Sequence, residues 1–168
     1  IFERRVSMFR EMRRKRQKLS KEKCIDILNR MTSGVLALYG DEGYPYAVPI
    51  SYVYHEGRLF FHSAVSGHKI DAISRSDKAS FCVISQDEVR PSEFTTYFQS
   101  VIAFGKIHIV EDDEVRYQSM QWLMDKYSPE ENECNRSKEM AKSFRHLFVI
   151  VLDIEHLTGK ESIEMVNL

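Results

Sequence analysis

The sequence predicts a small, mainly β protein with peripheral helices, in which one domain forms an antiparallel barrel. Six or seven short segments rich in Val, Ile, Tyr and Phe follow one another along the chain, separated by hairpin signals. These segments do not alternate regularly with long helices, which counts against a doubly wound nucleotide-binding fold. The length of 168 residues suits one domain better than two.

The composition is that of an ordinary globular protein, with 43% hydrophobic and 29% charged residues. It excludes global disorder and collagen-like chains. The three cysteines are widely spread and form no Cys-x-x-Cys pair, which argues against a disulfide framework or a zinc ribbon and for a reducing cytoplasm. No apolar run is long enough to span a membrane, and the N-terminus lacks the apolar core of a signal peptide.

Basic residues are concentrated at the N-terminus. Residues 1–30 carry 11 Lys and Arg against 4 Asp and Glu, whereas the other 138 residues carry 13 against 21. The dense stretch 10–18 could bind nucleic acid, although a solvated face or an arm lying on an acidic surface of a dimer is the preferred interpretation. We therefore separate a basic arm, 1–19, from a single domain, 20–168, and leave open whether 1–7 is native or precedes a start at Met8.

The first predicted element is a helix over 21–31. Ser20 suits its N-cap, Leu19 and Cys24 have the spacing of a hydrophobic staple, and Gly34 can end it. An apolar strand over 35–39 and a turn over 40–43 follow. Next come a long extended segment over 44–54, whose prolines predict an edge or a bulge, a hairpin loop over 55–58 and a returning strand over 58–63.

The second half of the chain continues this pattern. We expect helices over 66–76, 112–127 and 137–145, and strands over 78–85 and 147–153. The segment 94–110 is predicted as a pair of strands or as one long bent strand. Gly105 predicts a bulge or kink, and Asp112 and Asp113 suit the start of a helix. The segments 86–93 and 128–136 are predicted as polar loops, and 154–168 carries only a weak pattern.

A candidate anion site lies in 61–73. A strand ends in small polar residues, and Gly67 then opens a helix with His68 and Lys69 in its first turn. Free N–H groups, the helix dipole, the hydroxyls of Ser63 and Ser66 and the Lys69 ammonium could together hold a phosphate. An ordinary polar loop fits the same residues.

Two aromatic segments could pack a planar ring. One is 43–54 and the other is 94–106, where hydroxyl side chains alternate with aromatic ones. Core packing of a barrel strand explains 43–54 equally well and is the preferred explanation of 94–106.

Taken together, these blocks resemble the flavin-binding split β-barrel superfamily, which includes pyridoxamine-phosphate oxidase, and within it the nitroimidazole-resistance (Nim) type of flavoprotein. The resemblance covers Met8 to Glu164. It rests on blocks that follow one another in order, among them Thr32-Ser-Gly-Val-Leu-Ala, Gly43-Tyr-Pro-Tyr-Ala-Val-Pro, Phe61-His-Ser-Ala, Gly67-His-Lys-Ile-Asp-Ala-Ile, Phe94-Thr-Thr-Tyr-Phe, Lys126-Tyr-Ser-Pro and Glu155-His-Leu-Thr-Gly-Lys160.

The resemblance implies a split β-barrel homodimer with FMN sites at the subunit interface, FAD being the less favoured flavin. Lys69 would bind the phosphate with Ser63 and His68, and His62 would lie near the flavin as the candidate catalytic residue. The remaining cofactor contacts would come from the wall Val48, Pro49, Ile50, Ser51 and Tyr52, from Ala64, and from Thr96 and Tyr97, the last two from either the same or the other subunit.

The implied activity is reduction of a nitroaromatic small molecule, with NAD(P)H as a candidate electron donor. A protein that stores or senses flavin is the alternative, and nucleic-acid binding by the arm is a second one. The six histidines show no metal-ligand spacing, so no metal is expected, and no Gly-x-Ser-x-Gly supports hydrolysis. The substrate motifs of pyridoxamine-phosphate oxidases are not recognisable near the C-terminus.

Overall fold

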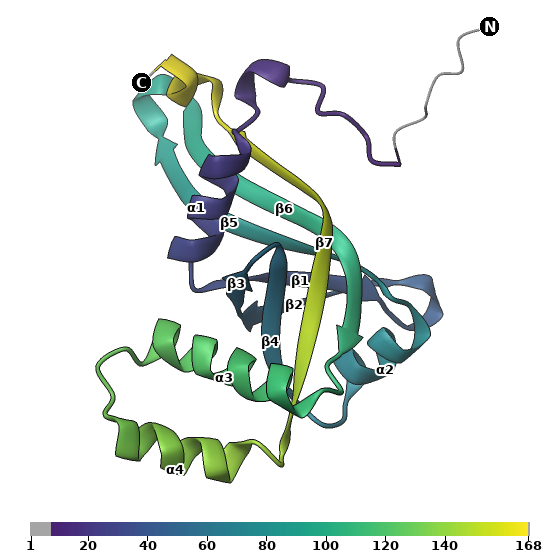
Figure 1. Ribbon diagram of the computed structural model, residues 1–168. Coiled ribbons are helices and arrows are strands. Elements are labelled where there is room, and N and C mark those ends of the chain that lie inside the picture. Colours follow the sequence, from purple (N-terminus) through teal and green to yellow (C-terminus); the bar gives the residue numbers. More distant parts are fainter. Residues whose placement is uncertain (1–7, 168) are drawn as a thin grey trace, which may run out of the picture.

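The computed structural model describes residues 8–167, and the prediction on residues 1–7 lies outside that range. Its four α-helices are α1 (Lys21–Arg30), α2 (His68–Arg75), α3 (Asp113–Tyr127) and α4 (Glu133–Ser143) (Figure 1). Its seven strands are β1 (Ser33–Tyr39), β2 (Pro45–Ser51), β3 (Val53–His55), β4 (Arg58–Ala64), β5 (Lys78–Arg90), β6 (Thr95–Ile109) and β7 (Leu147–Glu161).

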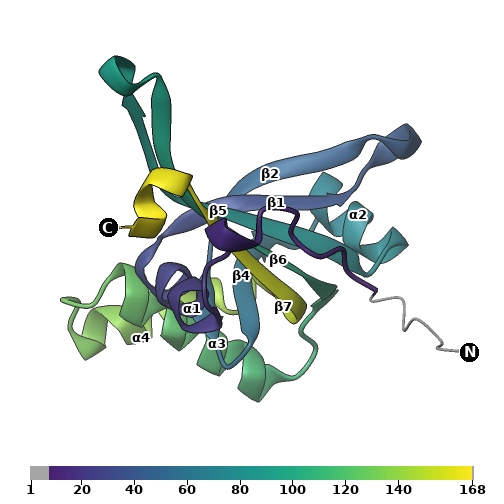
Figure 2. The ribbon, with the colours of Figure 1, turned by 90° about the horizontal axis from the view of Figure 1, so that it is seen from above.

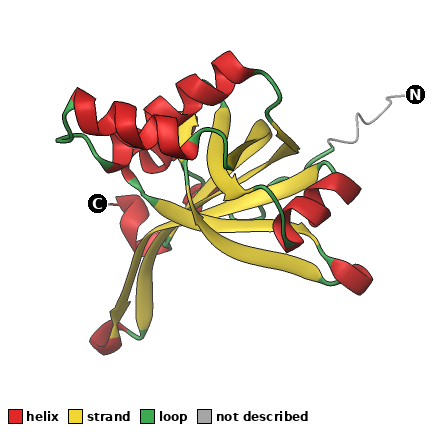
Figure 3. Ribbon diagram, turned by 90° about the horizontal axis from the view of Figure 1, so that it is seen from below, coloured by secondary structure: helices red, strands yellow, loops and turns green. Residues whose placement is uncertain are grey.

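All seven strands form one antiparallel sheet in the order β2-β1-β5-β6-β7-β4-β3. The two edge strands, β2 and β3, are separated in sequence by the single residue Tyr52. Because one residue spans less than 4 Å, the two edges of the sheet must meet there, and the sheet curls into a split barrel (Figure 3). The mainly β fold with peripheral helices is confirmed, and β2 is the edge strand that its two prolines predict.

The strands β5 and β6 project from the barrel as a long hairpin (Figures 1 and 2). The predicted loop over 86–93 is therefore wrong, because residues 86–90 pair with 95–99 and the turn takes up only 91–94. Similarly, the weakly patterned residues 154–161 continue β7 along β6. Both segments lack a clean alternation of apolar residues because the outer parts of these strands have little core to cover.

The helix boundaries follow local chemistry. Ser20 accepts a hydrogen bond from Lys23 N–H and Asp112 accepts one from Val115 N–H, so both N-terminal predictions hold. The helix α4 begins four residues before the prediction because Asn132, within the predicted loop, caps it by accepting from Asn135 N–H. The β6–β7 register shifts between Phe104 and Gly105, which confirms the bulge.

The core has two parts, and β4 divides them. Leu59 and Phe61 pack inside the barrel, whereas Phe60 packs against Val149, Met120 and neighbouring residues under α3 and α4. Side chains alternate along a strand, so His62, two positions after Phe60, lies on the face that these helices cover.

The described part of the N-terminal arm packs on its own chain. The Gln17 side chain is buried and its amide donates to the main-chain oxygen of Glu161 at 3.0 Å. The Phe9 ring stacks on His156 with centroids 4.7 Å apart. These contacts place the arm along the outer end of β7.

Candidate functional site

Two predicted site residues from different strands meet in one cavity. Ser51 at the end of β2 and His62 on β4 line a cavity of about 320 Å³ between the barrel and the α3–α4 pair. Its other walls are mostly apolar and come from Met120, Leu123 and Met124 of α3 and from Leu147 at the start of β7. The cavity is within the usual size range of small-molecule sites.

The surroundings of His62 favour its neutral form. Burial of part of its ring and the positive charge of Lys69 both lower the pKa of the imidazole, with burial the larger cause. A neutral imidazole has one nitrogen that donates and one that accepts a hydrogen bond. His62 can therefore orient a polar group of a ligand in the cavity.

Lys69 lies in the first turn of α2 and is partly buried. Burial lowers the pKa of its ammonium group, and no residue of the described range forms an ion pair or a hydrogen bond with its Nζ. No side chain caps α2, so the first N–H groups of this helix are also free of a side-chain partner. Gly67 has φ of 118°, and a Cβ there would meet nothing within 4 Å, so the loop is open toward an incoming group.

His68, the neighbour of Lys69, has other partners. Its Nε2 lies 3.4 Å from a carboxylate oxygen of Asp41, and its ring stacks on Tyr46 with centroids 4.0 Å apart. Arg75 binds the same carboxylate at 2.5 Å, and the hydrogen bond from Arg75 is the main reason why the pKa of Asp41 is lowered. His68 therefore ties α2 to the end of the β1–β2 hairpin, and a phosphate role would require it to leave Asp41.

The predicted wall on β2 divides into an inner and an outer face. Val48 and Ile50 pack on the barrel core, whereas Pro49 is exposed. Tyr52 is fully buried, so its side chain supports the wall from inside and cannot touch a ligand at the surface. Among these residues, Pro49 and Ser51 remain for contact through side chains.

The other predicted residues do not join this site within one chain. Ser63 is buried and points to the opposite face of β4 from His62, while Ala64 is exposed at the strand end. Thr96 and Tyr97 lie on the outer part of the projecting hairpin, at the other end of the molecule from α2 (Figures 1 and 2). The Tyr97 hydroxyl donates to Glu93 at 2.9 Å.

Tyr127 is a site residue that pattern reasoning on catalytic groups missed. Its hydroxyl accepts the main-chain N–H of Tyr52 at 2.9 Å and lies within donor range of the carbonyl oxygens of Tyr52, at 2.7 Å, and Thr32. Tyr52 is the residue that belongs to neither β2 nor β3, so Tyr127 replaces the strand partners missing at the seam of the barrel. Its only signal in the sequence is the block Lys126-Tyr-Ser-Pro.

The preceding residue, Lys126, strengthens the same seam. Its Nζ lies 4.2 Å from the centre of the Tyr52 ring and donates to the main-chain oxygen of Leu28 at 3.3 Å. Burial lowers the pKa of Lys126 to about 8. The end of α3 thus holds both the main chain and the ring of Tyr52.

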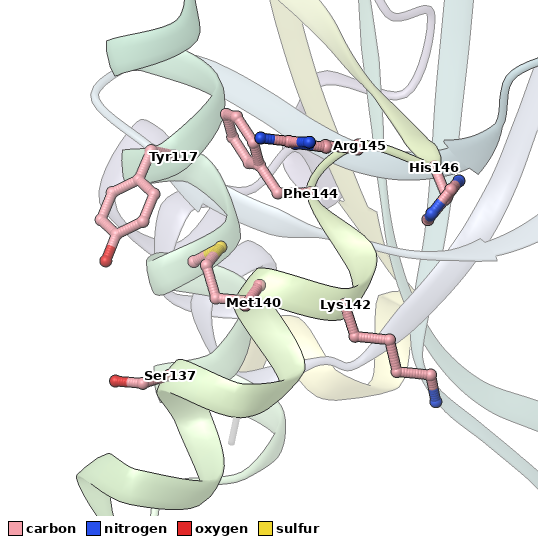
Figure 4. A pocket seen from close by; sticks show the side chains of 8 residues that line it. Tyr117, Ser137, Met140, Lys142, Phe144, Arg145 and His146 are labelled. Carbon is pink, nitrogen blue, oxygen red and sulfur yellow. The ribbon is translucent and has the colours of Figure 1, made fainter.

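A larger hollow of about 860 Å³ lies on the outer side of the helix pair and contains none of the predicted site residues. Figure 4 shows Met140 and Phe144 at this hollow, together with the basic side chains of Lys142, Arg145 and His146. Across residues 8–167 no group of three or more His, Cys, Asp and Glu side chains could hold a metal ion. No helix in that range is long and apolar enough to cross a membrane.

The split barrel thus carries, at the start of α2, a lysine that is unpaired among the described residues, and a small cavity beside His62. The pyridoxamine 5'-phosphate oxidase family matches residues 20–161, and the chain belongs to that family. No protein of the curated set matches the chain in sequence.

Solved structures share the fold. A candidate 5-nitroimidazole antibiotic resistance protein from Bacteroides thetaiotaomicron is 20% identical, with a TM-score of 0.74 and 86% of each chain covered. A conserved protein from Mycobacterium tuberculosis is 15% identical, with a TM-score of 0.79 and 92% of each chain covered. The FAD- and heme-binding protein from Mycobacterium smegmatis is 22% identical, with a TM-score of 0.72 and coverage of 88% of this chain and 74% of that one.

Proposed function

We propose that this protein is an FMN-dependent oxidoreductase that reduces small nitroaromatic compounds. The observation that carries the proposal is the position of Lys69, a partly buried ammonium without a carboxylate partner in the described chain, close enough to His62 to lower the pKa of that imidazole. A phosphate held at Lys69 would therefore leave the cavity beside His62 open for an acceptor. Membership of the pyridoxamine 5'-phosphate oxidase family supports a flavin in particular.

The residues present fit a flavin phosphate. A phosphate would satisfy the Lys69 ammonium and the free N–H groups at the start of α2, which now lack partners among residues 8–167. The bound flavin would supply the electron transfer. The protein's own part would be to hold the phosphate at Lys69, to support the ring along the Pro49–Ser51 edge, and to orient the acceptor at His62.

The proposal includes a homodimer with a flavin at each interface. The projecting hairpin exposes large apolar side chains, with Phe94 97% and Val89 66% exposed. A second copy would cover them, and each buried Å² of apolar surface would contribute roughly 25 cal/mol. The same hairpin would carry Thr96 and Tyr97 to the partner's site, which they cannot reach in their own chain. A stable monomer in sedimentation experiments on the flavin-loaded protein would contradict this arrangement.

The test of the cofactor compares two ligands that differ by the phosphate. Lys69→Ala should weaken FMN binding about ten- to a hundredfold, because a charge-assisted hydrogen bond is worth roughly 1.5–3 kcal/mol, and should leave riboflavin binding almost unchanged. Titration of both ligands followed by flavin fluorescence measures this. Equal losses for FMN and riboflavin would show that Lys69 holds the loop and not the phosphate.

The test of the activity separates an enzyme from a protein that only binds flavin. NAD(P)H should bleach the flavin spectrum under anaerobic conditions, and a nitroimidazole should restore it with loss of the nitro absorbance. A flavin that binds but is neither bleached nor reoxidised would favour storage or sensing. Nucleic-acid binding by the arm would appear as a salt-dependent shift with duplex DNA.

A further inference from the structure

The cavity beside His62 has an uneven distribution of charge. Its lining contains no Lys or Arg, and its single carboxylate belongs to Glu139 of α4. The hydroxyl of Ser143, one turn further along α4, donates to this carboxylate and holds it at the cavity wall. The remaining polar groups of the lining are the His62 imidazole and hydroxyls such as those of Ser51 and Ser128.

The size and the apolar wall of the cavity restrict its ligand. A cavity of roughly 150 Å³ lined by apolar side chains can hold benzene, so about 320 Å³ accommodates one substituted ring. Met120 and Met124 form part of this wall, and methionine side chains adapt well to flat, polarisable rings.

We propose that this cavity is the acceptor site. Its size restricts the acceptor to single-ring aromatic compounds, and Glu139 restricts these to compounds that are uncharged or cationic. The proposal rests on the proposed function, because it names the substrate class of the same site. A ring bearing a carboxylate would face Glu139 in a cavity without a compensating Lys or Arg in its lining. An uncharged ring would meet His62 and the hydroxyls at no such disadvantage. Glu139 is thus a specificity residue and takes no part in the electron transfer.

The experiment compares 4-nitrobenzyl alcohol with 4-nitrobenzoate, which share the ring and the nitro group and differ in charge. Dissociation constants for the flavin-loaded protein would come from ligand-observed NMR, and kcat/KM from nitro absorbance. The alcohol should bind roughly 3- to 10-fold more tightly than the benzoate, as expected for two like charges several ångströms apart in a partly solvated site. Glu139→Gln should remove most of this preference, and Glu139→Lys should reverse it.

The same helix offers a matched control. Glu133 accepts from Ser137, so it repeats the Glu and Ser spacing of Glu139 and Ser143, but it does not line the cavity. Glu133→Gln and Glu133→Lys should leave the preference unchanged. Met124→Trp, which fills the cavity, should weaken both ligands by a similar factor while the FMN affinity stays within about twofold of the original protein.

The outcomes separate the two proposals. Binding that follows Glu139 without reduction of either compound supports this inference and overturns the proposed activity. Reduction of both compounds with a preference that Glu139 variants do not change overturns this inference alone. The inference also fails if neither compound binds, if the Glu133 variants change the preference as much as the Glu139 variants, or if Met124→Trp has no effect.

Discussion

Removing the hydroxyl of Tyr127 should loosen the seam where the barrel is split. This oxygen accepts the main-chain N–H of Tyr52 at 2.9 Å, and its single proton is shared between the carbonyl oxygens of Tyr52, at 2.7 Å, and Thr32; Tyr52 is fully buried. Leaving a buried donor or acceptor unpaired costs about 1–3 kcal/mol. Because the Tyr127 side chain itself is 37% exposed, water can replace part of the lost bonding. We therefore expect Tyr127→Phe to lower the free energy of unfolding by about 1–2 kcal/mol.

The measurement is urea or thermal unfolding of the flavin-free protein at a fixed protein concentration. For a chain of this size, 1–2 kcal/mol corresponds to a fall in Tm of roughly 2–8 °C. Hydrogen exchange adds a local readout, since the Tyr52 amide should exchange faster while amides in the centre of β6 change little. The burial of Tyr127 raises the pKa of its phenol, so the effect should not change between pH 6 and 8.

Tyr117→Phe is the matched control on the same helix. Tyr117 is 46% exposed, and its hydroxyl bonds to no residue in the described range, although its ring packs on Phe144. Its loss should change the free energy of unfolding by less than about 0.5 kcal/mol. If Tyr127→Phe is no more destabilising than Tyr117→Phe, the seam does not depend on this hydroxyl and the reasoning is refuted.

Three further predictions follow from single contacts. Burial lowers the pKa of Lys126 to about 8, so between about pH 8 and 10.5 the unfolded chain binds more protons than the folded protein. The free energy of unfolding, measured with urea, should therefore rise with pH in that range, and Lys126→Met should flatten the rise. Gly105→Ala should lower the free energy of unfolding by about 1–3 kcal/mol in the same assay, because a Cβ there would lie 1.9 Å from the main-chain oxygen of Asp153. A loss below about 0.5 kcal/mol would contradict the bulge geometry. Lys69→Ala should raise the pKa of His62 in an NMR titration, since it removes a nearby positive charge, and an unchanged pKa would show that the two side chains are far apart.

The local elements of the fold could be predicted from the chain because they depend on neighbouring residues. Ser20 and Asp112 cap their helices, Pro45 and Pro49 mark an edge strand, and Gly105 marks the bulge. The loop over 86–93 and the weak tail were misjudged for the complementary reason. Their strands are stabilised by pairing across the sheet, and the side chains of the projecting hairpin carry no pattern of burial.

The candidate site shows the same division. Local pattern indicated Lys69 at a helix start, and the family resemblance placed His62 and Ser51 beside one flavin. Neither could reveal that α3 and α4 form the other wall of the cavity that His62 and Ser51 share. That arrangement depends on the edge strands β2 and β3 meeting at Tyr52, on Tyr127 bonding there from 75 residues away, and on α3 and α4 covering the outer face of β4. Residue types and their spacing therefore determined the helices, the edge strand and the position of Lys69 at a helix start. The curling of the sheet decided which of these elements face one another, because long-range packing has no signature in the local order of residues.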